Sequence, residues 1–100
     1  MAIRENAVEA RLRDRMKAVG GKAYKFTSPG ADGVPDRICV FPNGRIVFVE
    51  TKAPSVKDGL SERQKKEHRR LREMGCMVLV LRTYEEIEDM MMWYGPEHEV

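Results

Sequence analysis

The sequence DRICVFPNGRIVFVETK at residues 36–52 carries the clearest signal for the fold. Residues 36–41 and 45–52 are rich in β-branched and aromatic residues, and Pro42-Asn43-Gly44 separates the two runs. An Asn-Gly pair between two such runs is typical of the tight turn of a β-hairpin. The two runs are therefore predicted to be neighbouring antiparallel strands.

The second strand of this hairpin ends in two charged residues, Glu50 and Lys52. Because side chains alternate between the faces of a strand, both project on the same side as Ile46 and Phe48. We expect that row to face the core, with the two charges at its end. The hairpin also brings Asp36, at the start of the first strand, next to Glu50.

The segments around the hairpin alternate between helix and strand. Apolar residues recur at helical spacing before Gly20-Gly21, and capping boxes at 61–64 and 83–86 open two later helices. The helix between the third and fourth strands predicts that these strands pair in parallel. The predicted fold is α/β, a central mixed sheet of about four strands flanked by helices in the order α-β-β-β-α-β-α. Its elements are helices over 3–19, 61–74 and 83–95 and strands over 23–26, 36–41, 45–52 and 77–81.

Length and composition indicate one globular domain over residues 1–100. A net charge of +2 is too small to identify a nucleic-acid binder, so the distribution of charge has to be examined instead. No apolar run approaches the roughly 20 residues that span a bilayer, and the first residues lack a secretion signal. We therefore expect a cytoplasmic protein. Cys39 and Cys76 lie in apolar runs and are expected to be buried free thiols.

The first predicted helix carries two acids close to its apolar side, Glu5 and Glu9. At about 100° of rotation per residue, Glu5 falls inside the apolar arc and Glu9 at its edge. Both carboxylates are expected to face the protein. They either contribute to a site, or extend to solvent or pair with nearby arginines such as Arg13, and the helix alone leaves these interpretations open.

Asp36, Glu50 and Lys52 form an arrangement suited to a hard divalent cation. Mg²⁺ binds carboxylate oxygens and keeps several waters, so two or three carboxylates and a substrate phosphate complete its shell. A nearby ammonium group such as that of Lys52 orients water and offsets the negative charge of a phosphorane-like transition state. These residues together point to phosphodiester hydrolysis.

The segments Gly33-Val34-Pro35-Asp36-Arg37 and Phe48-Val49-Glu50-Thr51-Lys52 resemble the PD-(D/E)xK signature, and more specifically that of the virus-type replication-repair nucleases, the VRR-NUC family. The resemblance spans nearly the whole chain, from the first helix to Gly75. It implies a restriction-endonuclease-like core and a Mg²⁺- or Mn²⁺-dependent endonuclease acting on DNA. The catalytic set that it implies is Asp36, Glu50, Lys52, Glu9 and Gln64, with Asp36, Glu50, Glu9 and the backbone carbonyl of Thr51 as metal ligands.

Two of these assignments have alternatives. Glu9 lies eleven residues before Gly20, a spacing similar to that of the first-helix acid of archaeal Holliday junction resolvases, and is preferred to Glu5 for that reason. Gln64 would position Lys52 or a phosphate in the family, and its place in a capping box is a sufficient structural explanation as well.

The basic helix over 61–74 is the predicted DNA-contacting surface, because its cations can meet phosphates without reading bases. The alternative is a solvated helix in which Glu62, Glu67 and Glu73 neutralise their neighbours. His68, among these cations, is expected at the surface. The predicted DNA contacts are Lys25, Ser28, Arg63, Lys65, Lys66, Arg69 and Arg70.

Small members of the family, as found in phage and bacterial genomes, resemble homodimeric resolvases of four-way DNA junctions. If this chain is phage-encoded, the resemblance implies that it acts in the host cytoplasm. The apolar residues 90–94 are a candidate dimer interface, with simple core packing as the alternative. The expected partners are branched DNA and a second copy of the chain, without a membrane or an organic cofactor. Two other functions stay open: a nuclease acting on flaps or RNA, and a non-catalytic DNA-binding module of the same fold.

Overall fold

The computed structural model describes residues 4–55 and 59–96. The predicted order of helices and strands is confirmed, with bounds that shift by one or two residues; Ile3, the predicted first helical residue, lies outside the described residues. The elements are α1 (Glu5–Ala18), β1 (Lys22–Lys25), β2 (Arg37–Val40), β3 (Ile46–Thr51), α2 (Glu62–Glu73), β4 (Val78–Leu81) and α3 (Tyr84–Tyr94).

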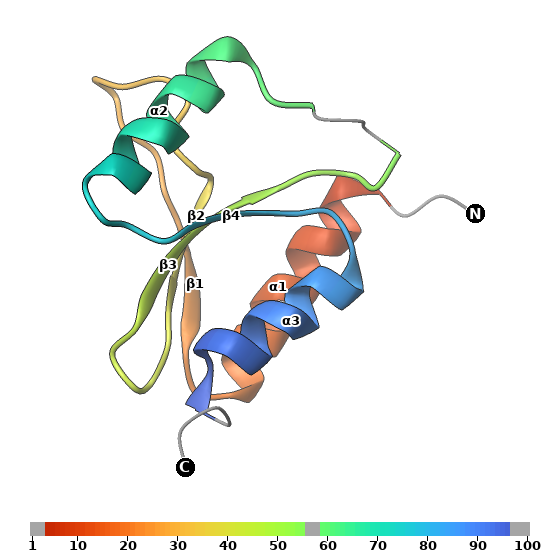
Figure 1. The fold of residues 1–100 in the computed structure, drawn as a ribbon. Helices are drawn as coiled ribbons and strands as arrows, with labels where there is room; N and C mark the ends of the chain where they lie inside the picture. Colours follow the sequence, from red (N-terminus) through yellow and green to blue (C-terminus); the bar gives the residue numbers. More distant parts are fainter. Residues whose placement is uncertain (1–3, 56–58, 97–100) are drawn as a thin grey trace.

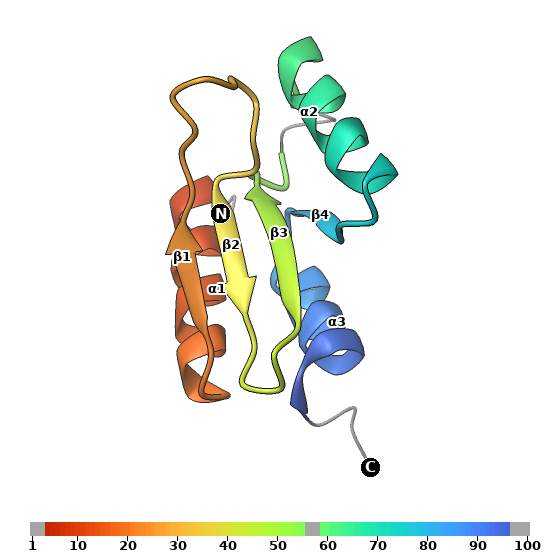
Figure 2. The ribbon, with the colours of Figure 1, turned by 90° about the vertical axis from the view of Figure 1, so that its left-hand side faces the viewer.

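The strands form one mixed sheet in the order β1-β2-β3-β4. The β1–β2 and β2–β3 pairs are antiparallel, and the β3–β4 pair is parallel, as the intervening helix predicted. Figure 1 shows α1 and α3 side by side on one face of the sheet and α2 on the other face. Figure 2 views the sheet from the side of α2, which lies near the end of β3 and next to β4. The molecule is thus a sheet between two helical layers of unequal size.

The hydrophobic core lies between the sheet and the α1–α3 layer. Val8, Leu12 and Met16 of α1, spaced as the sequence predicted, are all 0% exposed. From β3 they meet Val47 and Val49, which are also 0% exposed, whereas Ile46 is 52% exposed. The prediction that the Ile46 row faces the core is therefore wrong. Two helices cover the Val47 face, while α2 covers only part of the opposite face, so Glu50 projects toward the thinner layer.

Local signals place the ends of the elements. Both predicted capping boxes are present, at Ser61 with Gln64 and at Thr83 with Glu86, each with reciprocal side-chain to backbone hydrogen bonds. In the hairpin turn Gly44 has φ +88°, a conformation that glycine adopts without strain. These caps and turns hold the strand ends, and with them the charged residues, in a defined register.

Two expectations about burial are corrected in part. Cys39 is buried as predicted, but Cys76 is only partly buried; both thiols are free. In α3, Met90 and Met91 pack in the core, whereas Met92 and Trp93 are about three-fifths exposed, at 60% and 61%. The segment 90–94 therefore contributes to the core and to the surface. Within residues 4–55 and 59–96, every helix is too short or too polar to cross a membrane.

Candidate active site

Three carboxylates from three different elements meet at one end of the sheet. Each of Glu5, Asp36 and Glu50 offers an oxygen, and these oxygens all lie within 4.8 Å of one another. Glu5 is the first residue of α1, Asp36 directly precedes β2, and Glu50 is near the end of β3. The hairpin register pairs Arg37 with Val49. Asp36 precedes Arg37 and Glu50 follows Val49, so the two acids lie at the same end of the hairpin. The predicted convergence of Asp36 with Glu50 is what the structure shows.

Glu9, the preferred first-helix acid, has a different partner. Its Oε1 forms an ion pair with Nη2 of Arg37, a side chain that is only 11% exposed. Arg37 Nη1 also donates to the carbonyl of Ala23, 3.2 Å away, which fixes the guanidinium against β1. The structure therefore brings Glu5 rather than Glu9 into the carboxylate cluster. The reason is the position of each acid along α1. Glu9 lies about one helical turn further than Glu5 from the end of the sheet that carries the cluster, and it faces the buried Arg37.

Asp36 is held by the neighbouring strand end. Its Oδ1 accepts from the backbone N–H of Thr51 at 3.2 Å, and its Oδ2 accepts from the Thr51 hydroxyl at 3.1 Å. Burial raises the pKa of Asp36, and these hydrogen bonds oppose that shift by stabilising the charged form. The N–H and hydroxyl of Thr51 thus hold Asp36, and the predicted contribution of its backbone carbonyl to a metal stays a prediction.

Glu50 is the most deeply buried acid of the cluster, with a side chain only 5% exposed. Burial, followed by the negative charge of Asp36, raises its pKa from 4.5 to about 7, although Lys52 opposes the shift. The Lys52 ammonium lies 3.7 Å from Glu50 Oε2. The site therefore combines crowded negative charge with one adjacent amine, as the sequence predicted for Asp36, Glu50 and Lys52.

Gln64 contacts the site and caps its helix at the same time. Its Oε1 accepts from the Ser61 backbone N–H at 2.9 Å, while its Nε2 donates to Glu50 Oε2 at 3.4 Å. The capping explanation is confirmed, and the predicted role in positioning Lys52 or a phosphate stays a prediction. The side chain at the site that Gln64 contacts is Glu50.

His68 is not a surface residue, and that prediction is wrong. It is 1% exposed, and its Nε2 lies 3.8 Å from Glu50 Oε1. Burial lowers the pKa of His68, and the nearby cations Arg72 and Lys52 lower it further, so the ring is neutral at physiological pH. A signal was present in the sequence: His68 follows Gln64 by four residues and so shares its helix face. The many charged neighbours obscured that signal.

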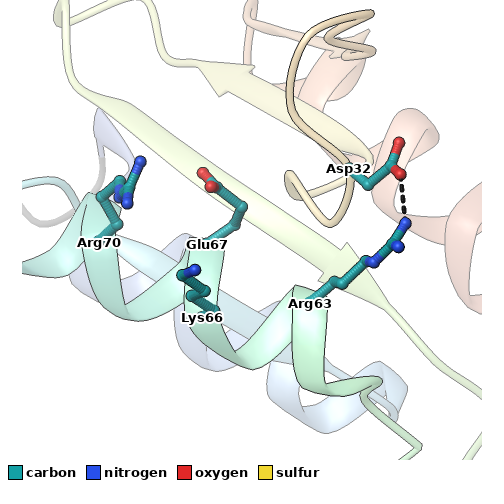
Figure 3. A pocket seen from close by; sticks show the side chains of 5 residues that line it. All are labelled: Asp32, Arg63, Lys66, Glu67 and Arg70. Carbon is teal, nitrogen blue, oxygen red and sulfur yellow. Dashed lines mark hydrogen bonds and ion pairs between the residues drawn. The ribbon is translucent and has the colours of Figure 1, made fainter.

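Three of the predicted DNA-contacting residues, Arg63, Lys66 and Arg70, line a hollow of about 340 Å³ between α2 and the loop over residues 27–35. Figure 3 shows Arg63, Lys66 and Arg70 projecting from α2 beside Glu67, with Asp32 of the loop facing Arg63. Arg63 Nη1 lies 2.6 Å from Asp32 Oδ2, an exposed ion pair that links the loop to the helix. The hollow thus presents three cations and two acids to solvent.

The other predicted contacts are outside this hollow. Lys25 is exposed at the end of β1, opposite Arg37, and Ser28 is partly buried in the loop. Arg69 is exposed on α2, whereas Lys65 lies 3.7 Å from Glu62, one of the intrahelical partners anticipated for a solvated helix. Lys65 therefore has an alternative role in its own helix.

Comparison with known proteins agrees with this geometry. Residues 3–84 match the VRR-NUC domain family. A protein named "Putative nuclease p44", from Acyrthosiphon pisum secondary endosymbiont phage 1, is 49% identical over 79 residues, which cover 79% of this chain and 83% of that protein. A solved structure of a VRR-NUC domain superposes with a TM-score of 0.80 at 31% identity, covering 90% of this chain and 96% of the other. This chain therefore belongs to the VRR-NUC family of PD-(D/E)xK nucleases.

Proposed function

We propose that this protein is a Mg²⁺- or Mn²⁺-dependent endonuclease that hydrolyses phosphodiester bonds in branched DNA and acts as a homodimer. The observation that carries the proposal is the meeting of Glu5, Asp36 and Glu50 within 4.8 Å, beside the Lys52 ammonium. Family membership supports the nuclease activity, and the proposal adds the metal, the substrate and the assembly.

The chemistry of the donor set fits a hard divalent cation. Glu5, Asp36 and Glu50 offer only carboxylate oxygens, the ligands that Mg²⁺ and Mn²⁺ prefer. Burial, and after it the negative charge of Asp36, raises the pKa of Glu50, and a doubly charged cation beside Glu50 would favour its charged form. Thr51 remains a candidate for a further ligand through its backbone carbonyl. When bound, such an ion supplies positive charge that polarises a phosphodiester and eases the deprotonation of water.

Two side chains beside the acids have distinct roles in this proposal. Lys52, with its ammonium 3.7 Å from Glu50, orients the attacking water and offsets the charge that develops on the phosphate oxygens. Gln64 holds the Glu50 carboxylate through its Nε2, so that the acid keeps its orientation when DNA arrives. We assign Glu9 to the support of Arg37 and not to the metal.

DNA would approach across α2 and the loop. Arg63, Lys66 and Arg70 line the hollow in Figure 3, and each can meet a backbone phosphate without base specificity. Arg69, on α2, and Lys25, at the end of β1, are further exposed cations that could contact phosphates. Glu67 and Asp32 limit the density of positive charge, which favours modest affinity and recognition by shape.

The proposal of a homodimer draws on exposed apolar surface. Ile46, Met77 and Trp93, with exposures of 52%, 44% and 61%, lie together around a second hollow. Apolar groups gathered in this way mark interaction surfaces more often than scattered ones do. A two-fold dimer would present two active sites in opposite orientation, which fits paired cuts across a DNA junction.

The decisive experiment incubates the purified protein with four-way junction, flap, linear duplex and single-stranded RNA substrates, in Mg²⁺, Mn²⁺ or EDTA. Asp36→Asn and Lys52→Ala are compared with the wild type. Asp14→Asn is the matched control, since Asp14 is an exposed acid of α1 roughly 14 Å along the helix from Glu5. We expect cleavage of the junction in either metal, none in EDTA, at least a hundredfold loss in both site variants and full activity in the control.

Each other outcome has a defined meaning. Undiminished cleavage by Asp36→Asn or Lys52→Ala would overturn the site assignment. Binding without cleavage in any metal would favour the non-catalytic DNA-binding module. Preference for flaps or RNA would replace the junction as substrate. Light scattering on the same sample measures the assembly, and a strict monomer that cuts junctions in pairs would refute the dimer.

A further inference from the structure

Three polar side-chain atoms of Glu50 and His68 are buried without a hydrogen bond to any described residue. They are Oε1 of Glu50 and both ring nitrogens, Nδ1 and Nε2, of His68. His68 Nε2 lies 3.8 Å from Glu50 Oε1, and both side chains are almost completely buried, at 1% and 5% exposed. Buried polar atoms are nearly always paired in folded proteins, so this grouping calls for a functional explanation.

The position of His68 on α2 matches that of Gln64. The two residues are four apart, so their side chains leave the same face of the helix. Gln64 Nε2 donates to one oxygen of Glu50, Oε2, at 3.4 Å. The imidazole of His68 faces the other oxygen, Oε1. One helix face therefore directs a nitrogen toward each oxygen of the same carboxylate.

The gap between His68 and Glu50 is small enough to close. A direct N–H to carboxylate hydrogen bond needs a separation of about 2.9 Å, roughly 0.9 Å less than the observed 3.8 Å. A small rotation of either side chain covers that difference. The resulting bond would satisfy two of the three unpaired atoms and fix the plane of the carboxylate.

We propose that His68 is a positioning residue for the cation site, donating a hydrogen bond from Nε2 to Oε1 of Glu50 and so fixing how that carboxylate meets the ion. The inference rests on the proposed function, because it assumes that Glu50 is a metal ligand. His68 itself is not a ligand in this scheme. Hydrogen-bonding partners behind metal ligands typically contribute 10- to 100-fold in metal affinity.

The test measures Mn²⁺ binding, by electron paramagnetic resonance titration, to the wild type, His68→Gln and His68→Asn. Both variants put a side-chain amide in the same buried position. The longer Gln places its NH₂ near the former Nε2, and the shorter Asn near the former Nδ1. We expect His68→Gln to bind Mn²⁺ within about threefold of the wild type and His68→Asn to bind at least tenfold more weakly. Urea unfolding of both variants accompanies the titrations.

A second measurement does not depend on how the variants fold. Long-range ¹H–¹⁵N NMR of the wild-type imidazole reports which ring nitrogen carries the proton, and we expect it on Nε2 of His68. A proton on Nδ1 would overturn the proposal, as would equal Mn²⁺ affinity in His68→Asn and the wild type, or equal weakening in both variants. Wild-type protein that binds no Mn²⁺ would instead refute the metal site and the proposed function with it.

Discussion

Asp36 and Thr51 join the ends of β2 and β3 through two hydrogen bonds to one carboxylate, 3.2 Å from the Thr51 N–H and 3.1 Å from its hydroxyl. Thr51 is 0% exposed, so the donors of both bonds are shielded from water, while Asp36 is partly exposed. They fix the orientation of Asp36 within 4.8 Å of the other two acids. The strand end thus supports the active site as well as the sheet.

Replacing the Thr51 hydroxyl should weaken both stability and metal binding. Thr51→Val keeps the shape and the backbone N–H bond but removes the bond to Asp36 Oδ2. We expect the free energy of unfolding to fall by about 1 kcal/mol and the Mn²⁺ affinity to fall about tenfold. Urea denaturation and Mn²⁺ titration measure the two effects. Thr51→Ser retains the hydroxyl and should bind Mn²⁺ like the wild type; equal affinity in Thr51→Val would refute the supporting role.

Substitutions of the two acids of α1, Glu5 and Glu9, should have different effects on Mn²⁺ affinity and on stability. Glu5 belongs to the carboxylate cluster, whereas Glu9 pairs with the buried Arg37. Glu5→Gln should lower Mn²⁺ affinity and cleavage at least tenfold without loss of stability, because it relieves repulsion among like charges. Glu9→Gln should lower the free energy of unfolding by about 1 kcal/mol and leave Mn²⁺ affinity nearly unchanged. The same titration and urea assays apply, and the reverse pattern would restore Glu9 as the first-helix ligand.

The stability of the metal-free protein should depend on the ionisation of Glu50. Its pKa is about 7 in the folded chain and near 4.5 when the chain is unfolded, so the folded state binds the proton more tightly. The stabilisation by this proton is complete below about pH 4.5 and is lost as the pH rises through 7. The loss is on the order of 3 kcal/mol. In EDTA, the free energy of unfolding should therefore fall between pH 5 and 8.

The variant Glu50→Gln and the addition of Mg²⁺ each isolate the contribution of Glu50 to the pH dependence of stability. The lowered pKa of His68 acts in the opposite direction, so the Glu50 contribution is taken as the difference between the wild type and Glu50→Gln. That variant should be more stable than the wild type at pH 8 and similar to it at pH 5. Mg²⁺ should stabilise the wild type at pH 8 and have little effect at pH 5, where protons compete for its ligands. Parallel pH profiles for the two proteins would contradict the raised pKa.

The sequence was sufficient for the parts of the site that depend on local pattern. The Asn43-Gly44 turn set the hairpin, and the hairpin register brought Asp36 to Glu50. Strand alternation placed Lys52 beside Glu50. Such relationships between close segments follow from backbone geometry, without knowledge of the rest of the fold.

The parts that failed depend on packing between distant elements. Alternation along β3 distinguishes two faces but does not say which one the larger helical layer covers, so Ile46 was wrongly placed in the core. Helical periodicity put Glu5 and Glu9 on the same side of α1. Which of them reaches the carboxylate cluster depends on how α1 packs along the sheet, where Glu9 pairs with the buried Arg37. His68 was misjudged from its charged neighbours, although its actual surroundings come from the sheet beneath α2.

The contact between Gly33 and α2 provides a final test of how the loop and the helix assemble the site. Gly33 has φ +91°, and a Cβ at this position would lie 2.5 Å from the backbone oxygen of Arg63. Gly33→Ala therefore combines an unfavourable backbone conformation with a clash against main chain, and the loop must move away from α2. Because Asp36 follows this loop and Gln64 follows Arg63, that movement would separate the groups that surround Glu50.

We expect Gly33→Ala to lower the free energy of unfolding by about 2 kcal/mol, equivalent to roughly 10 °C in Tm for a chain of this size. Cleavage should fall at least tenfold even at temperatures where the variant is fully folded. Gly30→Ala is the matched control, because a Cβ at Gly30 meets nothing within 4 Å and needs no positive φ. Calorimetry and cleavage assays on both variants decide the matter. If Gly33→Ala lost stability but kept full activity when folded, the contact between the loop and α2 would serve the fold alone. The contact between Gln64 and Glu50 would then not depend on the close approach of Gly33 to α2.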